Sequence, residues 1–198
     1  MYNKVNYRKN RGKKFALLFF LICFVILLTY LYHEYAPVFF YAESNYDSII
    51  SETAKRHHID PDLIRAVICQ ESKFNPNAVG SKGEVGLMQI RPEKGAVSDW
   101  IKKHKQKIRC RGVLFRPELN IEIGTWYLSE AVKNWAGYKY QYELALSEYN
   151  AGRNGMKQWV PDTFDGEVVE NITISSTKIY VKSIMKQFQK YAEKKEVK

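Results

Sequence analysis

Hydrophobic positions follow two different patterns along this 198-residue chain. From Phe15 to Tyr32, eighteen residues follow one another without a charge, which is close to the length of a membrane-spanning helix. Beyond residue 45, apolar residues recur three and four positions apart, in segments that Gly and Pro separate. This second pattern is typical of amphipathic helices packed around a core. The pattern therefore predicts one transmembrane helix followed by a single, mainly α-helical domain.

Five amphipathic segments are expected in the second part of the chain. The second of them has a clear beginning, because Asp60 is a good N-cap and Pro61 suits the first helical turn. Gly152 is expected to stop the fourth segment. Only "GEVVENITI", residues 166–174, has the pattern of an extended segment, so we expect at most a small strand element. The five segments are 44–59, 60–72, 116–135, with an apolar stripe of Ile121, Tyr127, Leu128, Ala131, Val132 and Trp135, then 140–152 and 175–195.

The charge distribution predicts the orientation of the transmembrane helix. Six of the formal +10 charges are Lys and Arg residues within 1–14, which contains no acid. Positive segments next to a membrane span stay in the cytoplasm, so the later residues are expected outside the cell. We expect four regions: a basic leader at 1–14, an anchor at 15–32, a linker at 33–45 and a folded domain at 46–198.

A cleaved signal peptide is the alternative interpretation of the apolar stretch. Its best support is Ala42, a small residue that could precede a cleavage site. The position two residues earlier is Phe40, whereas signal cleavage sites prefer a small residue there, and the apolar run exceeds a usual signal core. We therefore favour a retained anchor.

A glutamate interrupts the apolar face of segment 60–72. Glu71 follows Ile64 by seven positions and Val67 by four, so the three residues share one face of a helix. A carboxylate placed among apolar groups loses hydration, which raises its pKa and keeps it protonated near neutral pH. The pattern predicts a proton donor. The alternative is that Glu71, in the last turn, swings out to water or pairs with Lys73.

Two further stretches carry residues that suit a carbohydrate site. The loop after Glu71 contains Gly83 and Gly86, where backbone can approach a ligand closely, and then Gln89, which offers both a donor and an acceptor. Farther along, Tyr149 and Asn150 stand side by side at a predicted helix end. Sugar rings present apolar faces and hydroxyl edges, so an aromatic ring beside an amide is a suitable combination.

Three ordered motifs resemble the catalytic domain of the soluble-type lytic transglycosylases. They are Glu-Ser with a later Asn-Pro (71–76), Gly-Leu-Met-Gln-Ile (86–90) and Tyr-Asn-Ala-Gly with a later Trp (149–159). The likeness covers roughly residues 46–192. It implies a lysozyme-like helical fold, related to goose-type lysozyme, and cleavage of the β-1,4 bond between N-acetylmuramic acid and N-acetylglucosamine in peptidoglycan, with 1,6-anhydro-muramic acid ends.

The resemblance also implies roles for individual residues. Glu71 would act as the single acid and base, with the substrate's acetamido group as nucleophile, since substrate-assisted enzymes need no second carboxylate. Substrate-binding residues by the same resemblance are Ser72, Met88, Gln89, Tyr149, Asn150 and Tyr180. For Met88, core packing is an equal alternative. The other acids near these motifs are expected to be solvated surface charges: Glu84, Glu143 and Glu148.

Two positions depart from the family pattern and leave other functions open. Arg91 follows Gly-Leu-Met-Gln-Ile where relatives often have Met, and Ser176 stands where they usually have Glu. A muramidase on the same fold, or a non-catalytic wall-binding scaffold, are therefore the alternatives to a lyase.

The expected partners are peptidoglycan strands and, through the N-terminal helix, a membrane. No Cys or His spacing indicates a metal site, and no cofactor is expected. Outside residues 1–14 the chain has 25 basic and 21 acidic residues, an excess of about 4 that favours an anionic wall or membrane over nucleic acid. The sequence identifies no protein partner in the wall-building or secretion machinery.

Overall fold

The structure is a computed structural model that describes residues 2–196 and divides into two compact units, residues 1–44 and 45–198. Residues 1 and 197–198, at the ends of the expected leader and domain, lie outside the described residues. So do the side chains of 2–12, 14, 35–42 and 195–196, which include most of the basic leader.

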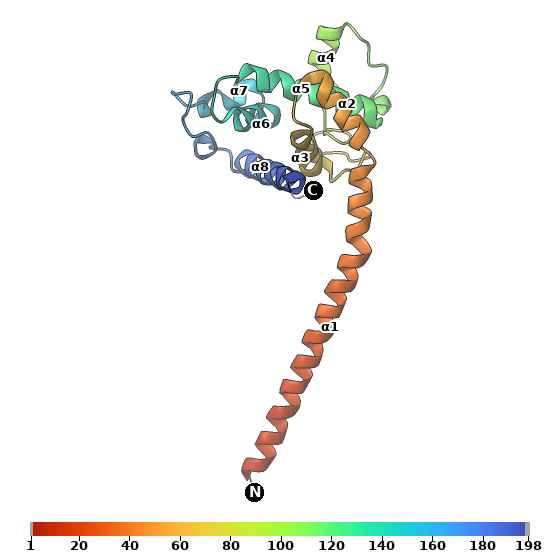
Figure 1. The fold of residues 1–198 in the computed structure, drawn as a ribbon, viewed down its shortest axis with the longest axis vertical. Helices are drawn as coiled ribbons and strands as arrows, with labels where there is room; N and C mark the ends of the chain where they lie inside the picture. Colours follow the sequence, from red (N-terminus) through yellow and green to blue (C-terminus); the bar gives the residue numbers. More distant parts are fainter. Residues whose placement is uncertain (1, 197–198) are drawn as a thin grey trace. The chain divides into compact units, whose positions relative to one another are not determined.

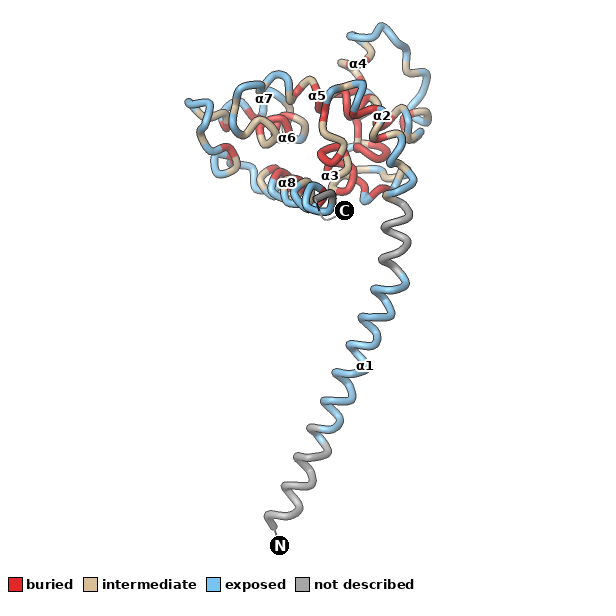
Figure 2. The backbone as a smooth tube through the Cα atoms, viewed as in Figure 1, coloured by how far each residue is buried: buried red, intermediate tan, exposed pale blue. Residues whose placement is uncertain are grey.

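The first unit is the helix α1 (Tyr2–Ser44), shown from red to orange in Figure 1. Within it, Phe15–Glu34 has a mean hydropathy of 2.7, and its residues are exposed, as the pale blue of Figure 2 shows. By length and composition this stretch can cross a membrane. The expected anchor, residues 15–32, falls within it.

The second unit is helical, as the sequence predicts. Its described elements are α2 (Asp47–His57), α3 (Pro61–Ser72), α4 (Ala96–His104), η1 (Arg111–Phe115), α5 (Pro117–Asn134), α6 (Gln141–Ala151), α7 (Arg153–Met156), η2 (Lys157–Trp159), η3 (Val169–Asn171) and α8 (Ser175–Glu196). Helices α2, α3, α5, α6 and α8 confirm the five expected segments. Helix α4 was not expected, because its nine residues are few and mostly polar.

Local sequence accounts for both ends of α3. The side chain of Asp60 accepts a hydrogen bond from the backbone N–H of Asp62 at 2.8 Å, and Pro61 occupies the first turn. Lys73 ends the helix in the left-handed conformation, with φ 53°, and its N–H bonds to the carbonyl of Cys69. This ending fixes the position of the last helical turn, which contains Glu71.

Helix α5 is the centre of the domain, because α2, α4, α6 and η1 all pack against it. The expected one-sided stripe is confirmed at Ile121, Leu128 and Ala131, which are buried, but not at its other three positions. Tyr127, Val132 and Trp135 are only partly buried, whereas Ile123 and Trp126, outside the stripe, are buried. A helix that neighbours surround on several sides buries residues on several faces. Figure 2 shows that much of α5 is buried.

The extended segment expected at 166–174 is also wrong, because it contains the short 3₁₀ helix η3 instead. Its alternating pattern matches a strand, but it has no neighbouring strand to pair with. The small strand-like element of the described residues lies elsewhere, in two isolated antiparallel bridges that join Val79 to Val85 and Val85 to Ile90.

A buried asparagine on α5 holds the loop that contains these bridges. The Asn120 side chain donates to the carbonyls of Val85 (2.9 Å) and Leu114 (2.7 Å) and accepts from the N–H of Met88 (2.7 Å). Gly86, with φ 76°, lies so close that an added Cβ would be 2.2 Å from Asn120 Nδ2. One fully buried amide therefore satisfies three backbone groups and sets the course of residues 85–88.

The contact between Met88 and α5 leads to a stability prediction. In Gly124→Ala, the added methyl group would lie 2.8 Å from Met88 Cβ, so we expect a loss of about 1–3 kcal/mol. The matched control is Gly155→Ala in α7, where the closest atom would be 3.5 Å away and the higher helix propensity of Ala stabilises. Thermal unfolding should separate the two variants, and equal melting temperatures would contradict this packing.

Candidate active site

An open cleft of about 790 Å³ crosses the domain between α3, the loop at 80–95, the end of α6 and the start of α8. Five of the seven residues that the sequence nominates line it: Glu71, Gln89, Tyr149, Asn150 and Tyr180. They come from positions up to 109 residues apart in the chain. The fold therefore brings together residues that the sequence only suggested as separate motifs.

Glu71 is partly buried in the last turn of α3, and the hydroxyl of Tyr180 donates a hydrogen bond to its Oε1 at 2.7 Å. Burial raises the pKa of the Glu71 carboxyl from 4.5 to about 7. The hydrogen bond from Tyr180 works against this rise, and the negative charge of Glu84 adds to it. Near neutral pH the carboxyl thus exists in both protonation states, as an acid and base should.

The two tyrosines of the cleft are hydrogen-bond donors. Tyr149 donates to the carbonyl oxygen of Met88 at 2.9 Å, while Tyr180 donates to Glu71. Burial, together with the nearby charge of Glu71, raises the pKa of both phenols well above 10. Both hydroxyls consequently keep their protons at any pH at which Glu71 titrates.

The two amides of the cleft are held by different contacts. Gln89, with φ 46°, donates from Nε2 to the carbonyls of Ala78 (3.2 Å) and Gly86 (2.9 Å). Asn150 accepts a hydrogen bond from the Thr177 hydroxyl at 2.8 Å. This bond uses the amide oxygen of Asn150. The amide nitrogen makes no hydrogen bond to the described residues, so it is free to donate to a ligand in the cleft.

The remaining two nominated residues lie behind the cleft surface. Ser72 is buried, and its hydroxyl donates to the carbonyl of Ile68 at 3.2 Å. Met88 is fully buried in the core, where the Thr125 hydroxyl lies 3.7 Å from its sulfur. Neither side chain lines the cleft, and the substrate contacts suggested for them stay predictions.

The other acids do not all behave as solvated surface charges. Glu84 lines the cleft and accepts hydrogen bonds from Arg91 Nε (3.2 Å) and the N–H of Lys82 (2.9 Å). Burial by itself would raise the pKa of Glu84. These hydrogen bonds and the positive charge of Arg91 outweigh that effect, so the pKa lies below 4.5. Glu84 is therefore an ionised neighbour of Glu71.

The expectation is wrong for Glu148, which is only 6% exposed. It accepts hydrogen bonds from Trp135 Nε1 at 2.8 Å and from Arg153 Nε at 3.0 Å. Glu143 is partly buried, which raises its pKa. Neither Glu143 nor Glu148 lines the cleft, so neither is the second acid of the site.

The site has contributors that sequence reasoning missed or left undecided. Thr177 positions Asn150, and both departures from the family pattern, Arg91 and Ser176, line the cleft. Asn120 was missed, although a polar side chain between apolar neighbours on a predicted helix was a signal. Among the described residues, no cluster of His, Cys, Asp and Glu side chains is arranged to hold a metal ion.

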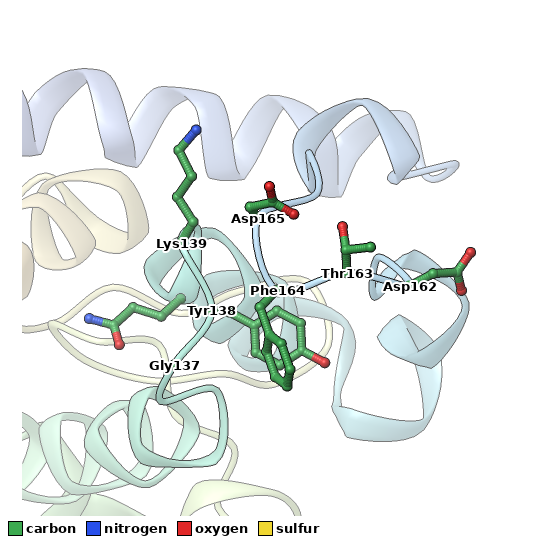
Figure 3. Close-up of a pocket in the computed structure, with 8 residues that line it drawn as sticks. Gly137, Tyr138, Lys139, Asp162, Thr163, Phe164 and Asp165 are labelled. Atoms are coloured by element: carbon green, nitrogen blue, oxygen red, sulfur yellow. The ribbon is translucent and has the colours of Figure 1, made fainter.

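A second hollow lies between residues 137–141 and 162–165, and it shares no lining residue with the cleft. There the rings of Tyr138 and Phe164 pack with centroids 4.9 Å apart, and Asp162 and Asp165 point away from them (Figure 3). The N–H of Lys139 donates to the carbonyl of Phe164 at 2.8 Å. These contacts join two loops and assemble no group of reactive side chains.

Comparisons with known proteins agree on one family. The family model described as the transglycosylase SLT domain matches residues 48–170. The membrane-bound lytic murein transglycosylase E of Buchnera aphidicola is 30% identical over 133 residues, which are 67% of this chain and 60% of that protein. The soluble lytic murein transglycosylase of Salmonella typhimurium is 30% identical, over 71% of this chain and 22% of that protein. The chain thus spans less than two thirds of the length of these relatives.

A solved structure gives the same answer for the fold. The X-ray structure of an inactive mutant of the lytic transglycosylase Slt from Pseudomonas aeruginosa superposes with a TM-score of 0.64 and 27% sequence identity. The match covers 74% of this chain and 24% of that one. The mainly α, lysozyme-like fold that the sequence predicts is therefore confirmed.

The raised pKa of Glu71 predicts a pH-dependent stability. Below pH 4.5 the carboxyl is protonated in both folded and unfolded chains. Between pH 4.5 and 7 the unfolded chain ionises this carboxyl while the folded chain keeps its proton, so stability falls by up to about 3 kcal/mol over this range and levels off above pH 7. Glu71→Gln carries no such cost, so it should be more stable than the parent chain at pH 8 and similar to it at pH 4.

Chemical denaturation at pH 4, 6 and 8 measures this difference. The matched control is Glu52→Gln in α2, whose side chain is exposed, and it should follow the parent chain at every pH. A constant difference between Glu71→Gln and the parent chain across the series would show that Glu71 is not destabilised by ionisation.

Proposed function

Because the chain belongs to the transglycosylase SLT domain family, we propose that it is a membrane-anchored lytic transglycosylase of the cell wall. It cleaves the β-1,4 bond between N-acetylmuramic acid and N-acetylglucosamine in peptidoglycan and leaves 1,6-anhydro-muramic acid ends. The observation that carries this proposal is the Glu71 carboxyl, which lines an open cleft and has a pKa of about 7.

In the first step, Glu71 is the acid. Its protonated carboxyl donates a proton to the glycosidic oxygen as the bond to the anomeric carbon breaks, and the acetamido oxygen of the muramoyl residue attacks that carbon. The electron pair of the broken bond leaves with the N-acetylglucosamine oxygen, which the proton neutralises. Because the substrate supplies the nucleophile, no second carboxylate is required.

In the second step, Glu71 is the base. The carboxylate, which accepts the hydrogen bond from Tyr180, removes the proton of the muramoyl 6-hydroxyl. The 6-oxygen attacks the anomeric carbon and the acetamido oxygen departs, which closes the anhydro ring and restores protonated Glu71. A pKa near 7 serves both steps, since neither protonation state is then strongly disfavoured.

Gln89, Tyr149 and Asn150 are proposed to hold the sugar beside Glu71. All three line the same cleft, and the Asn150 amide nitrogen is a donor for a sugar hydroxyl or acetamido oxygen. Tyr180 is proposed to act on the reacting carboxyl, through its hydrogen bond to Glu71, as well as on the sugar. Ser72 and Met88 are proposed to act indirectly, through the shape of the cleft wall.

One observation favours a second candidate function, hydrolysis by a muramidase. Glu84 is an ionised carboxylate in the same cleft, and such a group can activate water as a general base. Against this role, Glu84 is already held by Arg91 and the N–H of Lys82. We favour the lyase.

The proposed location is the cell membrane, in a single pass, with the domain facing the wall. Support comes from the apolar stretch Phe15–Glu34, from the basic residues before it, and from relatives named membrane-bound lytic murein transglycosylases. We propose a cytoplasmic leader at 1–14, an anchor at 15–32, a linker at 33–45 and a catalytic domain at 46–198.

Mass spectrometry of digested peptidoglycan tests this function. The parent chain should release muropeptides lighter by one water than hydrolysis products, because the anhydro ring forms in place of a reducing end. Reducing ends would indicate the muramidase, and no release would indicate a wall-binding scaffold.

Glu71→Gln tests the role of the acid in the same assay. We expect turnover to fall by at least 100-fold, since the amide can neither give nor take the proton. Glu52→Gln, an exposed substitution of the same kind, should keep full turnover. Substantial activity in Glu71→Gln would remove Glu71 from the mechanism.

A further inference from the structure

We propose that a basic groove between α3 and α8 binds the carboxylates of the stem peptides that peptidoglycan carries on its muramoyl residues. This inference rests on the proposed function, because it assigns the groove to the same substrate. The groove has a volume of about 240 Å³, and its polar lining consists of Gln70, Lys73, Ser183, Lys186, Gln187 and Lys190. Helices α3 and α8 pack side by side there (Figure 1).

The groove brings together positive charges that no described carboxylate pairs with. Lys73 comes from the end of α3, whereas Lys186 and Lys190 come from α8, and all three are exposed. Among the side chains that the structure describes, none of the three forms an ion pair. Three ammonium groups that converge from two helices attract an anion.

The lysines of α8 form a row that is unfavourable for the helix itself. Lysines stand at 178, 182, 186, 190 and 194, always four residues apart, so neighbours lie on one face and repel each other. Glu170 forms ion pairs with the first two, at 3.2 and 3.0 Å. The groove begins beyond these ion pairs. A bound anion would offset the repulsion that remains there.

The groove also offers neutral hydrogen-bond donors. Gln70, Ser183 and Gln187 are partly buried and line it together with the lysines. Amide and hydroxyl groups beside ammonium groups suit a carboxylate, which accepts several hydrogen bonds at once. The chemistry of the groove is thus that of a site for carboxylates, rather than of a surface that is merely solvated.

Gln70 joins the groove to the cleft, because it lines both. It is the residue before Glu71, so the groove starts next to the proposed acid. Lys73 follows Gln70 by three residues, which corresponds to a rise of about 5 Å at helical spacing. A stem peptide of three or four residues spans at most about 10–14 Å, so one attached to the muramoyl residue beside Glu71 reaches the groove.

Phosphate groups of a wall polymer or of a membrane lipid are the other anions that lysines attract. A membrane lipid is not attached to the sugar that would occupy the cleft, and the proposed second step requires a free 6-hydroxyl on that sugar, whereas the same muramoyl residue carries the stem peptide. Continuity through Gln70 therefore favours the carboxylates of the stem peptide. This assignment predicts that the protein distinguishes peptide-bearing strands from strands without peptides.

Equilibrium binding of the full chain in detergent micelles tests the proposal, with Glu71→Gln as the background so that no strand is cleaved. The ligands are soluble glycan strands that carry stem peptides and the same strands stripped of them by an amidase. Lys186→Gln/Lys190→Gln should weaken binding of the peptide-bearing strands about tenfold. It should leave binding of the stripped strands unchanged.

The matched control is Lys103→Gln/Lys107→Gln, which removes the same charge from exposed positions outside the groove and the cleft. It should bind both ligands like the background chain. Added salt should weaken binding of the peptide-bearing strands in the background and control chains more than in the groove variant. Thermal unfolding of each variant verifies the fold.

Three results would overturn the proposal: equal losses for both ligands, an equal loss in the control variant, or competition by polyphosphate but not by free stem peptide. Because binding is read in the inactive background, an absence of cleavage by the parent chain would count against the proposed function alone.

Discussion

The hydrogen bond from Tyr180 to Glu71 is the interaction on which the site depends. It joins the last turn of α3 to α8, two helices that are distant in the chain and packed together in the domain. The same packing removes water from the carboxyl, which favours its neutral form, whereas the hydroxyl favours the ionised form. The balance leaves the pKa of Glu71 close to physiological pH.

A second constraint, the buried amide of Asn120, fixes the opposite wall of the cleft. It holds the backbone at Val85 and Met88, and Met88 in turn accepts the hydrogen bond of Tyr149. The cleft wall that contains Gln89 is therefore held by a buried side chain of α5, and not only by contacts within the loop. Side chains on a supported wall lose less freedom when a ligand binds.

Local sequence was sufficient for the features of the domain that depend on neighbouring residues. Residue type predicted that Asp60 caps the start of α3 and that Gly152 ends α6. Helical spacing within α3 predicted that Glu71 lies on an apolar face. The Glu71 prediction needed only helical periodicity and the cost of dehydrating a carboxylate. The pairing of Glu71 with Tyr180 needed the resemblance, because 109 residues separate them.

Features that depend on the surroundings of an element were not predictable in this way. Helix α5 is buried on several sides because four elements pack around it, and Glu148 is buried because Trp135 and Arg153 close over it. Residues 166–174 have a strand-like pattern but no partner strand, so they form η3 and irregular backbone. In each case, contacts between distant segments decide the outcome.

The measurement that tests the central claim most directly is a site-specific NMR titration of the Glu71 carboxyl carbon in the folded, unliganded chain. The account predicts a midpoint near pH 7, and a higher one in Tyr180→Phe, where the donor to the carboxylate is lost. A midpoint near 4.5 in the parent chain would mean a solvated, ionised glutamate at neutral pH. The acid and base roles assigned to it would then be wrong.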